Sequence, residues 1–163
     1  MKRLWFVLLF ILGLVVGMML ASVLIMSEAS AQQPPFNYHG RVARVVDGDT
    51  FYISVEGGQL ACPQATRCLR KVRIADIDAP ETSSRAKCER ERTRGAHATL
   101  VLTNILRTDL VEVRVRKIDR YHRDFGYVFH NGIDVGARMM ELGHALPWLD
   151  RMPKPDHCND PRQ

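Results

Sequence analysis

The sequence predicts a protein of the α+β class that is mainly β, with five short strands forming a small Greek-key barrel and two or three helices. Three observations lead to this prediction. Apolar and polar residues alternate over several short segments, as in strands with one buried face. A longer segment after the third strand has apolar residues at helical spacing. The roughly 130 residues that follow an apolar N-terminal segment suit one domain with a single core.

The strands and helices are punctuated by turn residues. An Asp-Gly turn separates the first two strand candidates, Ala79-Pro80 ends the third, and Asn131-Gly132 follows the last. Gly143 marks the end of a short second helix. The expected strands are residues 41–46, 50–55, 69–77, 111–115 and 125–130, and the expected helices are residues 84–106 and 135–142.

The N-terminal segment directs export. Residues 4–26 are uncharged and mostly apolar, they follow Lys2 and Arg3, and the small residues 29–31 match the spacing of a signal-peptidase site. The apolar run is also long enough to cross a bilayer. We therefore expect residues 1–31 to be a cleaved signal peptide or a retained membrane anchor, with the domain periplasmic, extracellular or anchored outside the cytoplasmic membrane.

The rest of the chain divides into three parts. Residues 32–39 contain two consecutive prolines and are expected to be an extended linker, residues 40–150 the domain, and residues 151–163 a C-terminal tail. The net charge of +5 is modest: it helps to attract a polyanion but does not by itself establish nucleic-acid binding. The dense charges of residues 85–94 favour a solvated helix face.

All four cysteines lie in the exported part, where disulfides are the default. Cys62 and Cys68 bracket a short loop, and a bridge there leaves Cys88 to pair with Cys158. The chain has no Cys-x-x-Cys pair, so a zinc site is the weaker interpretation.

Three short motifs combine acids with arginines. Residues 47–50 form an acidic turn, residues 73–81 hold one arginine and three carboxylates around a strand end, and residues 119–123 supply further arginines. Carboxylates suit a hard cation, and guanidinium groups match phosphate oxygens in pairs. The combination indicates metal-assisted cleavage of phosphodiesters.

In these motifs the chain resembles the staphylococcal thermonuclease family, over about residues 40–148. The resemblance rests on residues 45–50, 73–81 and 119–123 in that order, and it implies an OB-type barrel. It further implies that Asp49 and Asp78 bind calcium together with the backbone carbonyl of Ala79. Oxygen-only ligands suit that ion.

The resemblance also assigns the remaining chemistry. Glu81 matches the general base beside the attacking water, and Arg73 and Arg123 match the pair that binds the scissile phosphate and stabilises its growing charge. Arg120, Tyr121 and Trp148 are candidates for substrate binding, the last by stacking on a base.

Two residues depart from the family pattern. His122 stands where a glycine usually precedes the second arginine, so it either adjusts the loop backbone or lies near the substrate. Asp76 adds a carboxylate that shares a face with Asp78 if the strand is regular. It either strengthens the cation site or is solvated.

The function expected from these residues is an exported, calcium-dependent, nonspecific endonuclease acting on DNA and RNA, with single strands preferred. The resemblance implies products with 3'-phosphate ends, and no obligate protein partner is inferred. The alternative is an OB-fold nucleic-acid-binding protein of the cell envelope with weak or absent catalysis. The acidic cluster argues against this alternative, because a pure binder needs cations only.

Overall fold

The computed structural model of the 163-residue chain describes residues 36–107, 109–149 and 151–161. The expectations for residues 1–31 and for most of the linker lie outside these ranges. Within the described ranges, no helix is both long and apolar enough to cross a membrane.

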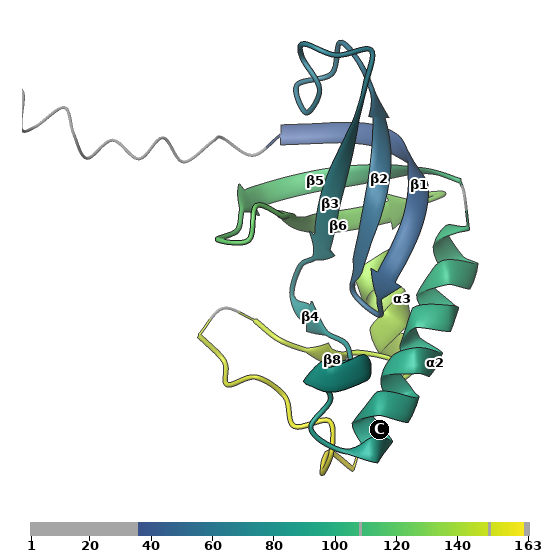
Figure 1. The fold of residues 1–163 in the computed structure, drawn as a ribbon, viewed down its shortest axis with the longest axis vertical. Coiled ribbons are helices and arrows are strands. Elements are labelled where there is room, and N and C mark those ends of the chain that lie inside the picture. Colours follow the sequence, from purple (N-terminus) through teal and green to yellow (C-terminus); the bar gives the residue numbers. More distant parts are fainter. Residues whose placement is uncertain (1–35, 108, 150, 162–163) are drawn as a thin grey trace, which may run out of the picture. The chain divides into compact units, whose positions relative to one another are not determined.

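Five strands close into a barrel with two helices beside it (Figure 1). The order around the barrel is β3-β2-β1-β5-β6, and parallel pairing of β3 with β6 closes it. This confirms the predicted α+β barrel of OB type. The barrel strands are β1 (Phe36–Asp47), β2 (Thr50–Glu56), β3 (Arg67–Ile74), β5 (Leu110–Ile118) and β6 (Asp124–His130).

The core lies inside the barrel and under the long helix. Val111, Val113 and Val115 of β5 are buried while the residues between them are more exposed, as the alternation of a half-buried strand requires. Helix α2 (Glu89–Leu106) contributes Leu102 and Leu106 to the same core. The pattern of apolar residues therefore dictates both the barrel and the helix face that covers it.

Strand β1 begins earlier than the expected domain boundary at residue 40. Its first residues pair with β5, Phe36 opposite Val115 and Tyr38 opposite Val113, and both aromatic side chains are buried. Residues 36–39 therefore belong to the barrel and not to a linker. Their alternation of aromatic and polar side chains was the available signal.

The third predicted strand is interrupted. Strand β3 ends at Ile74, and the chain turns at Asp76, whose φ is 62°. The short strand β4 (Ile77–Asp78) then pairs with β8 (Leu146–Pro147) in a separate two-stranded sheet. A regular strand over residues 69–77 was therefore wrong at its end, and this break sets where Asp78 points.

Helix α2 starts at the N-cap residue Cys88, later than the expected residue 84, and residues Ser83–Arg85 form a separate 3₁₀ turn, η1. The loop between β4 and η1 contains Pro80 and Glu81. Helix α3 (Val135–Glu141), which follows the short strand β7 (Ile133–Asp134), begins at its Asp134 cap and precedes Gly143 at φ 73°. A left-handed glycine after the helix is the expected terminator.

Both expected disulfides are present in the structure. Cys62–Cys68 closes the loop between β2 and β3, and Cys88–Cys158 joins the N-terminus of α2 to the C-terminal tail. The described part has no free cysteine. The second bridge brings the tail beside the acidic residues described next.

Candidate active site

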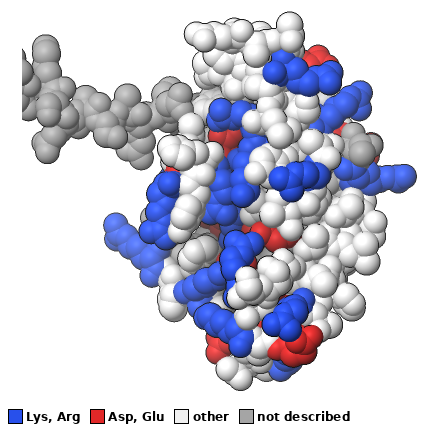
Figure 2. Space-filling model, in the orientation of Figure 1, with Lys and Arg blue, Asp and Glu red and all other residues white. Residues whose placement is uncertain are grey.

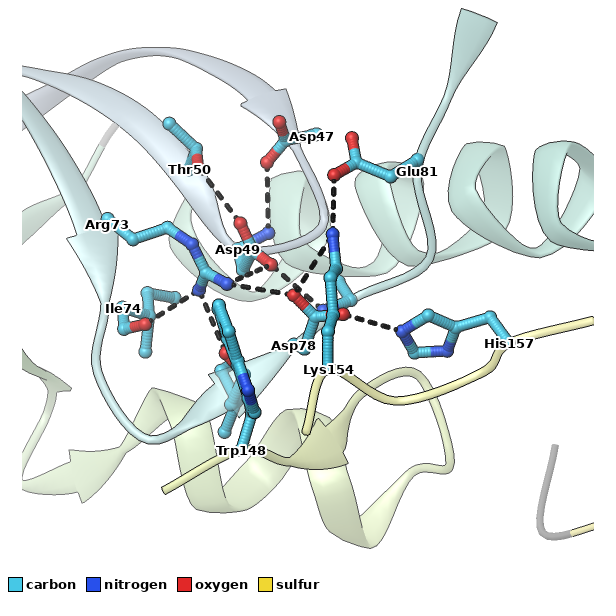
Figure 3. A network of polar contacts seen from close by, with 12 residues as sticks. Asp47, Asp49, Thr50, Arg73, Ile74, Asp78, Glu81, Trp148, Lys154 and His157 are labelled. Carbon is cyan, nitrogen blue, oxygen red and sulfur yellow. Dashed lines mark hydrogen bonds and ion pairs between the residues drawn. The ribbon is translucent and has the colours of Figure 1, made fainter. Parts of the chain in front are cut away.

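Three segments converge at the end of the barrel next to β4 (Figure 3). The turn between β1 and β2 supplies Asp49, the end of β3 supplies Arg73, and β4 with its following loop supplies Asp78 and Glu81. The two central carboxylates and the arginine are buried, whereas Glu81 is half-buried. The structure thus brings together four residues predicted from two separate motifs.

Hydrogen bonds at both oxygens fix the orientation of Asp49. Its Oδ1 accepts from the Thr50 hydroxyl at 2.9 Å, and its Oδ2 accepts from the Ala79 backbone N–H at 2.9 Å. The Asp49 N–H itself donates to Oδ1 of Asp47 at 3.3 Å. The carboxylate of the turn therefore faces β4.

Two glycines permit the close packing behind this cluster. A Cβ at Gly48 would lie 2.6 Å from the Cβ of Ala79, so a larger residue would push the acidic turn away from β4. A Cβ at Gly95 of α2 would lie 2.5 Å from the carbonyl oxygen of Glu81. Gly48 is thus required by close approach, not by an unusual turn conformation as its Asp-Gly context suggested.

Arg73 is the centre of the cluster. Its Nη1 donates to the carbonyls of Ile74 at 2.8 Å and Ile77 at 3.0 Å. Its Nη2 lies 3.1 Å from Oδ2 of Asp49 and 3.2 Å from Oδ1 of Asp78. Two carboxylates, one from the β1–β2 turn and one from β4, therefore converge on one guanidinium nitrogen.

Burial raises the pKa of Asp49 to about 7. The charge of Arg73 and the Ala79 N–H oppose this shift, whereas the carboxylates of Asp47 and Asp78 add to it. Burial therefore outweighs the available positive charge. An additional cation at this point would relieve the cost of ionising Asp49.

Glu81 is held by two basic side chains. Its Oε2 lies 3.2 Å from Nε of Arg85, and its Oε1 accepts from Nζ of Lys154 at 3.0 Å. The Glu81 N–H contacts Oε1 of the buried Glu91 at 3.4 Å, which anchors the loop to α2. Lys154 belongs to the tail and was not among the predicted site residues.

Arg123 is positioned by its own loop. Asp119 accepts from the N–H groups of Tyr121 and Arg123 through Oδ1, at 2.8 and 3.0 Å, and from Nε of Arg123 through Oδ2 at 2.7 Å. Burial alone would raise the pKa of Asp119, but these bonds hold it below its usual value. His122 lies exposed at this turn with φ 57°, so it occupies the left-handed conformation that favours glycine.

A groove of about 590 Å³ connects the two arginines. Both Arg73 and Arg123 line it, and so do the three residues predicted to bind substrate, Arg120, Tyr121 and Trp148. Among the charged side chains on the face of the molecule seen in Figure 2, Lys and Arg predominate over Asp and Glu. The structure therefore places every arginine of the predicted site along one basic groove.

Asp76 does not join the cluster. Its carboxylate pairs with Nη1 of Arg116 at 2.9 Å and accepts from the Tyr127 hydroxyl at 2.6 Å. The left-handed turn at Asp76 directs it away from Asp78, because the strand is not regular there. The sequence left two interpretations of Asp76 open, a cation ligand or a solvated acid. Neither is correct, because Asp76 is paired with Arg116 and Tyr127.

The tail contributes a second unpredicted residue. His157 is 2% exposed, and its Nε2 lies 2.9 Å from Oδ2 of Asp78. The signal that pointed to it was the expected Cys88–Cys158 bridge, which ties the neighbouring residue to the start of α2. That bridge located the tail but not the direction of its side chains.

The atoms beside Arg73 that could bind a metal ion are the carboxylate oxygens of Asp49 and Asp78. Among the residues with described positions, no group of three or more His, Cys, Asp or Glu side chains is arranged to hold a metal ion. The two converging carboxylates of Asp49 and Asp78 fit a hard cation that completes its shell with backbone and water oxygens, not a closed protein cage.

Comparison with known proteins identifies the family. Residues 71–159 match the family of staphylococcal nuclease homologues. A protein of Shigella flexneri named micrococcal nuclease is 36% identical over 93 residues, which cover 57% of this chain and 43% of the relative. A protein of Escherichia coli O157:H7 named uncharacterized endonuclease is 30% identical over 108 residues, 66% of this chain and 59% of the relative.

The barrel and its acid–arginine cluster thus define a nuclease-like protein, and the chain belongs to the staphylococcal nuclease homologue family. The resemblance inferred from the three motifs is confirmed. The chain spans about half the length of the curated relatives it matches.

Proposed function

We propose that the chain is an exported, calcium-dependent endonuclease that hydrolyses phosphodiester bonds of DNA and RNA and leaves 3'-phosphate ends. The observation that supports this most directly is the cluster around Arg73, where two buried carboxylates meet one guanidinium at the end of a groove that also holds Arg123. Binding alone gives no reason to bury two acids beside a basic groove.

Asp49 and Asp78, with the carbonyl of Ala79, would hold the calcium ion. The burial that raises the pKa of Asp49 supports this assignment, because a divalent cation offsets the cost of the buried charge. Bound calcium would supply positive charge to the phosphate under attack.

The remaining roles follow from position. Glu81 is half-buried beside the carboxylates and accepts the proton of the attacking water. The Nη1 of Arg73 is bonded to two backbone carbonyls, and its Nη2, which contacts Asp49 and Asp78, would be shared with a phosphate oxygen. Arg123 belongs to the loop of residues 119–123, where Asp119 fixes it, and it binds the same phosphate as Arg73.

The outer face of β6 supports the preference for single strands. Phe125, Tyr127 and Phe129 alternate along it and are half-buried. A basic side chain of β5 lies over each ring. Nζ of Lys117 is 5.3 Å from the ring centroid of Phe125, Cζ of Arg116 is 5.6 Å from that of Tyr127, and Cζ of Arg114 is 4.1 Å from that of Phe129. Aromatic rings beside cations bind unpaired bases and their phosphates without reading sequence.

Export is the proposed location because residues 1–31 have the composition of a signal peptide or membrane anchor and because all four cysteines form disulfides. The domain is then periplasmic, extracellular or held at the membrane by that segment.

Cleavage assays on the full chain, expressed for export and purified in mild detergent, test the proposal. Labelled single-stranded DNA, duplex DNA and RNA are incubated with calcium, magnesium or chelator, and the ends are analysed for 3'-phosphate. We expect calcium-dependent cleavage, fastest on single strands, and a large loss of rate with retained binding in Glu81→Gln. Equal cleavage with and without chelator would refute the calcium mechanism, and binding without cleavage would favour the inactive binding module.

A further inference from the structure

The C-terminal residues 153–158, called the tail segment below, extend into the active site from a distant part of the sequence. The segment lies beside β4 and the loop that holds Glu81 (Figure 3). Its Cys158 is 70 residues from its disulfide partner Cys88. The proposed function gives this segment no role.

The tail segment is held firmly. Cys158 is bonded to the N-cap residue of α2, and its carbonyl accepts from Nη1 of Arg90 at 3.5 Å. Pro153 and Pro155 flank Lys154 and restrict the backbone on both sides of it. A segment fixed in this way can place side chains with little entropic cost.

His157 orients Asp78. An ionised carboxylate only accepts hydrogen bonds, so His157 donates from Nε2 to Oδ2 at 2.9 Å. The other oxygen, Oδ1, accepts from Nη2 of Arg73 at 3.2 Å. Each oxygen of the proposed metal ligand therefore has its own donor, and the carboxylate plane is fixed.

Lys154 places an ammonium between the proposed base and the proposed ligand. Its Nζ lies 3.0 Å from Oε1 of Glu81 and 3.7 Å from Oδ1 of Asp78. The dashed lines in Figure 3 join Lys154 to Glu81 and Asp78, which belong to the acidic cluster that would attract a divalent cation. A fixed positive charge at this distance opposes the binding of a second one.

We propose that the tail segment is a working part of the active site, in which His157 positions Asp78 for the metal and Lys154 competes with the metal for Asp78 and Glu81. This inference rests on the proposed function, because it assigns both residues to the same calcium site. It predicts opposite effects on calcium affinity for the two residues, whereas a purely structural tail changes only the melting temperature.

Calorimetric titration with calcium alone, without nucleic acid, tests the proposal on the full chain in mild detergent. His157→Phe should weaken calcium binding by about 10-fold or more, the usual range for the partner of a metal ligand. His157→Gln keeps an N–H donor and should recover most of the affinity. Lys154→Met should tighten binding by about 3-fold to 10-fold, since it removes an opposing charge.

A matched control separates local from general charge effects. Lys71→Met removes a lysine that lies over Tyr52 on the barrel, and it should leave calcium affinity unchanged. Thermal melting of each variant reports whether it is folded, and Lys154→Met keeps the test decisive if His157→Phe does not fold.

The outcomes distinguish failure of the metal site from failure of the role of the tail segment. A wild-type chain that binds no calcium overturns the proposed metal site itself. Wild-type binding together with unchanged affinity in His157→Gln, His157→Phe and Lys154→Met overturns only the role of the tail segment. Weaker binding in Lys154→Met overturns the competition with the metal.

Discussion

Nη2 of Arg73 lies 3.1 Å from Oδ2 of Asp49, where both side chains are more than nine-tenths buried. The guanidinium cannot turn away freely, because its Nη1 is bonded to two backbone carbonyls. The arginine assigned to the phosphate is therefore also the counter-ion of a proposed calcium ligand. Stability and catalysis are coupled at this pair.

Replacing Arg73 by alanine should affect both properties. Without calcium, the variant leaves Asp49 and Asp78 buried without their main cation, and loss of one partner of a buried pair costs about 3 to 5 kcal/mol. Calcium should restore part of this loss, and cleavage should fall by orders of magnitude. Thermal melting with and without calcium, beside cleavage rates, measures each effect.

Arg120→Ala is the matched control for that measurement. Arg120 is exposed, so its loss should change the stability by no more than about 0.5 kcal/mol and leave the response to calcium intact. Full activity in a folded Arg73→Ala variant contradicts the assignment of Arg73 to the phosphate.

Replacing Asp49 by asparagine should separate the metal site from the scaffold. Asparagine retains an acceptor for the Ala79 N–H and removes a buried charge. At pH 8 without calcium, the melting temperature of the variant should therefore equal that of the wild type or exceed it by about 2 to 4 °C. Calcium should no longer raise its melting temperature, and calcium-dependent cleavage should be lost. Near-wild-type cleavage would instead identify Asp49 as a turn cap only.

The advantage of Asp49→Asn should depend on pH. The folded-state pKa of Asp49 is raised to about 7 from the usual 3.8, so between these values the native state binds a proton that the unfolded state does not. The wild type therefore gains stability as the pH falls from 7 toward 4, and asparagine does not. A melting difference that shrinks over this range supports the shift, and a constant difference opposes it.

The sequence predicted the barrel and most of the site because both depend on local signals. Alternating apolar residues define the strands, and the residues expected to act together, Asp49, Arg73 and Asp78, lie at strand ends and turns, where separate segments meet. These positions allow the side chains to converge, and the resemblance to the thermonuclease family assigned them to one site.

The remaining features depend on contacts that the local pattern does not encode. The left-handed turn at Asp76 breaks a strand that reads as continuous, and the acid pairs with Arg116 of β5 instead. The cysteine count located the tail, but the approach of Lys154 and His157 to the carboxylates follows from tertiary packing alone. Long-range polar contacts of this kind leave no periodic signal.

In the loop that presents Arg123, cleavage should depend on Asp119 but tolerate replacement of His122 by glycine. Asp119→Ala removes three hydrogen bonds, two of them to Arg123, and should reduce cleavage by at least about 10-fold, toward the larger loss expected for Arg123→Ala. His122→Gly should retain the rate, because glycine adopts φ 57° without strain.

Single-turnover cleavage rates of these three variants provide the comparison, with melting curves to confirm folding. A strong loss of rate in His122→Gly would place the imidazole at the substrate. An unchanged rate in Asp119→Ala would mean that Arg123 reaches the phosphate without its anchor.

Gly95→Ala should destabilise the protein although it improves helix propensity. Alanine is favoured over glycine in a helix by about 1 kcal/mol. Here, however, the added Cβ would lie 2.5 Å from the carbonyl oxygen of Glu81 and 2.7 Å from that of Pro80, and neither backbone group can rotate away as a side chain can. Overpacking of this kind costs about 1 to 3 kcal/mol, so the steric effect should equal or exceed the gain.

The same substitution should slow cleavage, because relief of the contact requires α2 or the loop that holds Glu81 to move. Thr93→Ala, at an exposed position of the same helix, is the control and should be neutral or slightly stabilising with an unchanged rate. Chemical denaturation gives the free energy of unfolding, and cleavage at saturating calcium gives the rate. A Gly95→Ala variant that is more stable than the wild type and equally active would show that the close approach of α2 does not position Glu81.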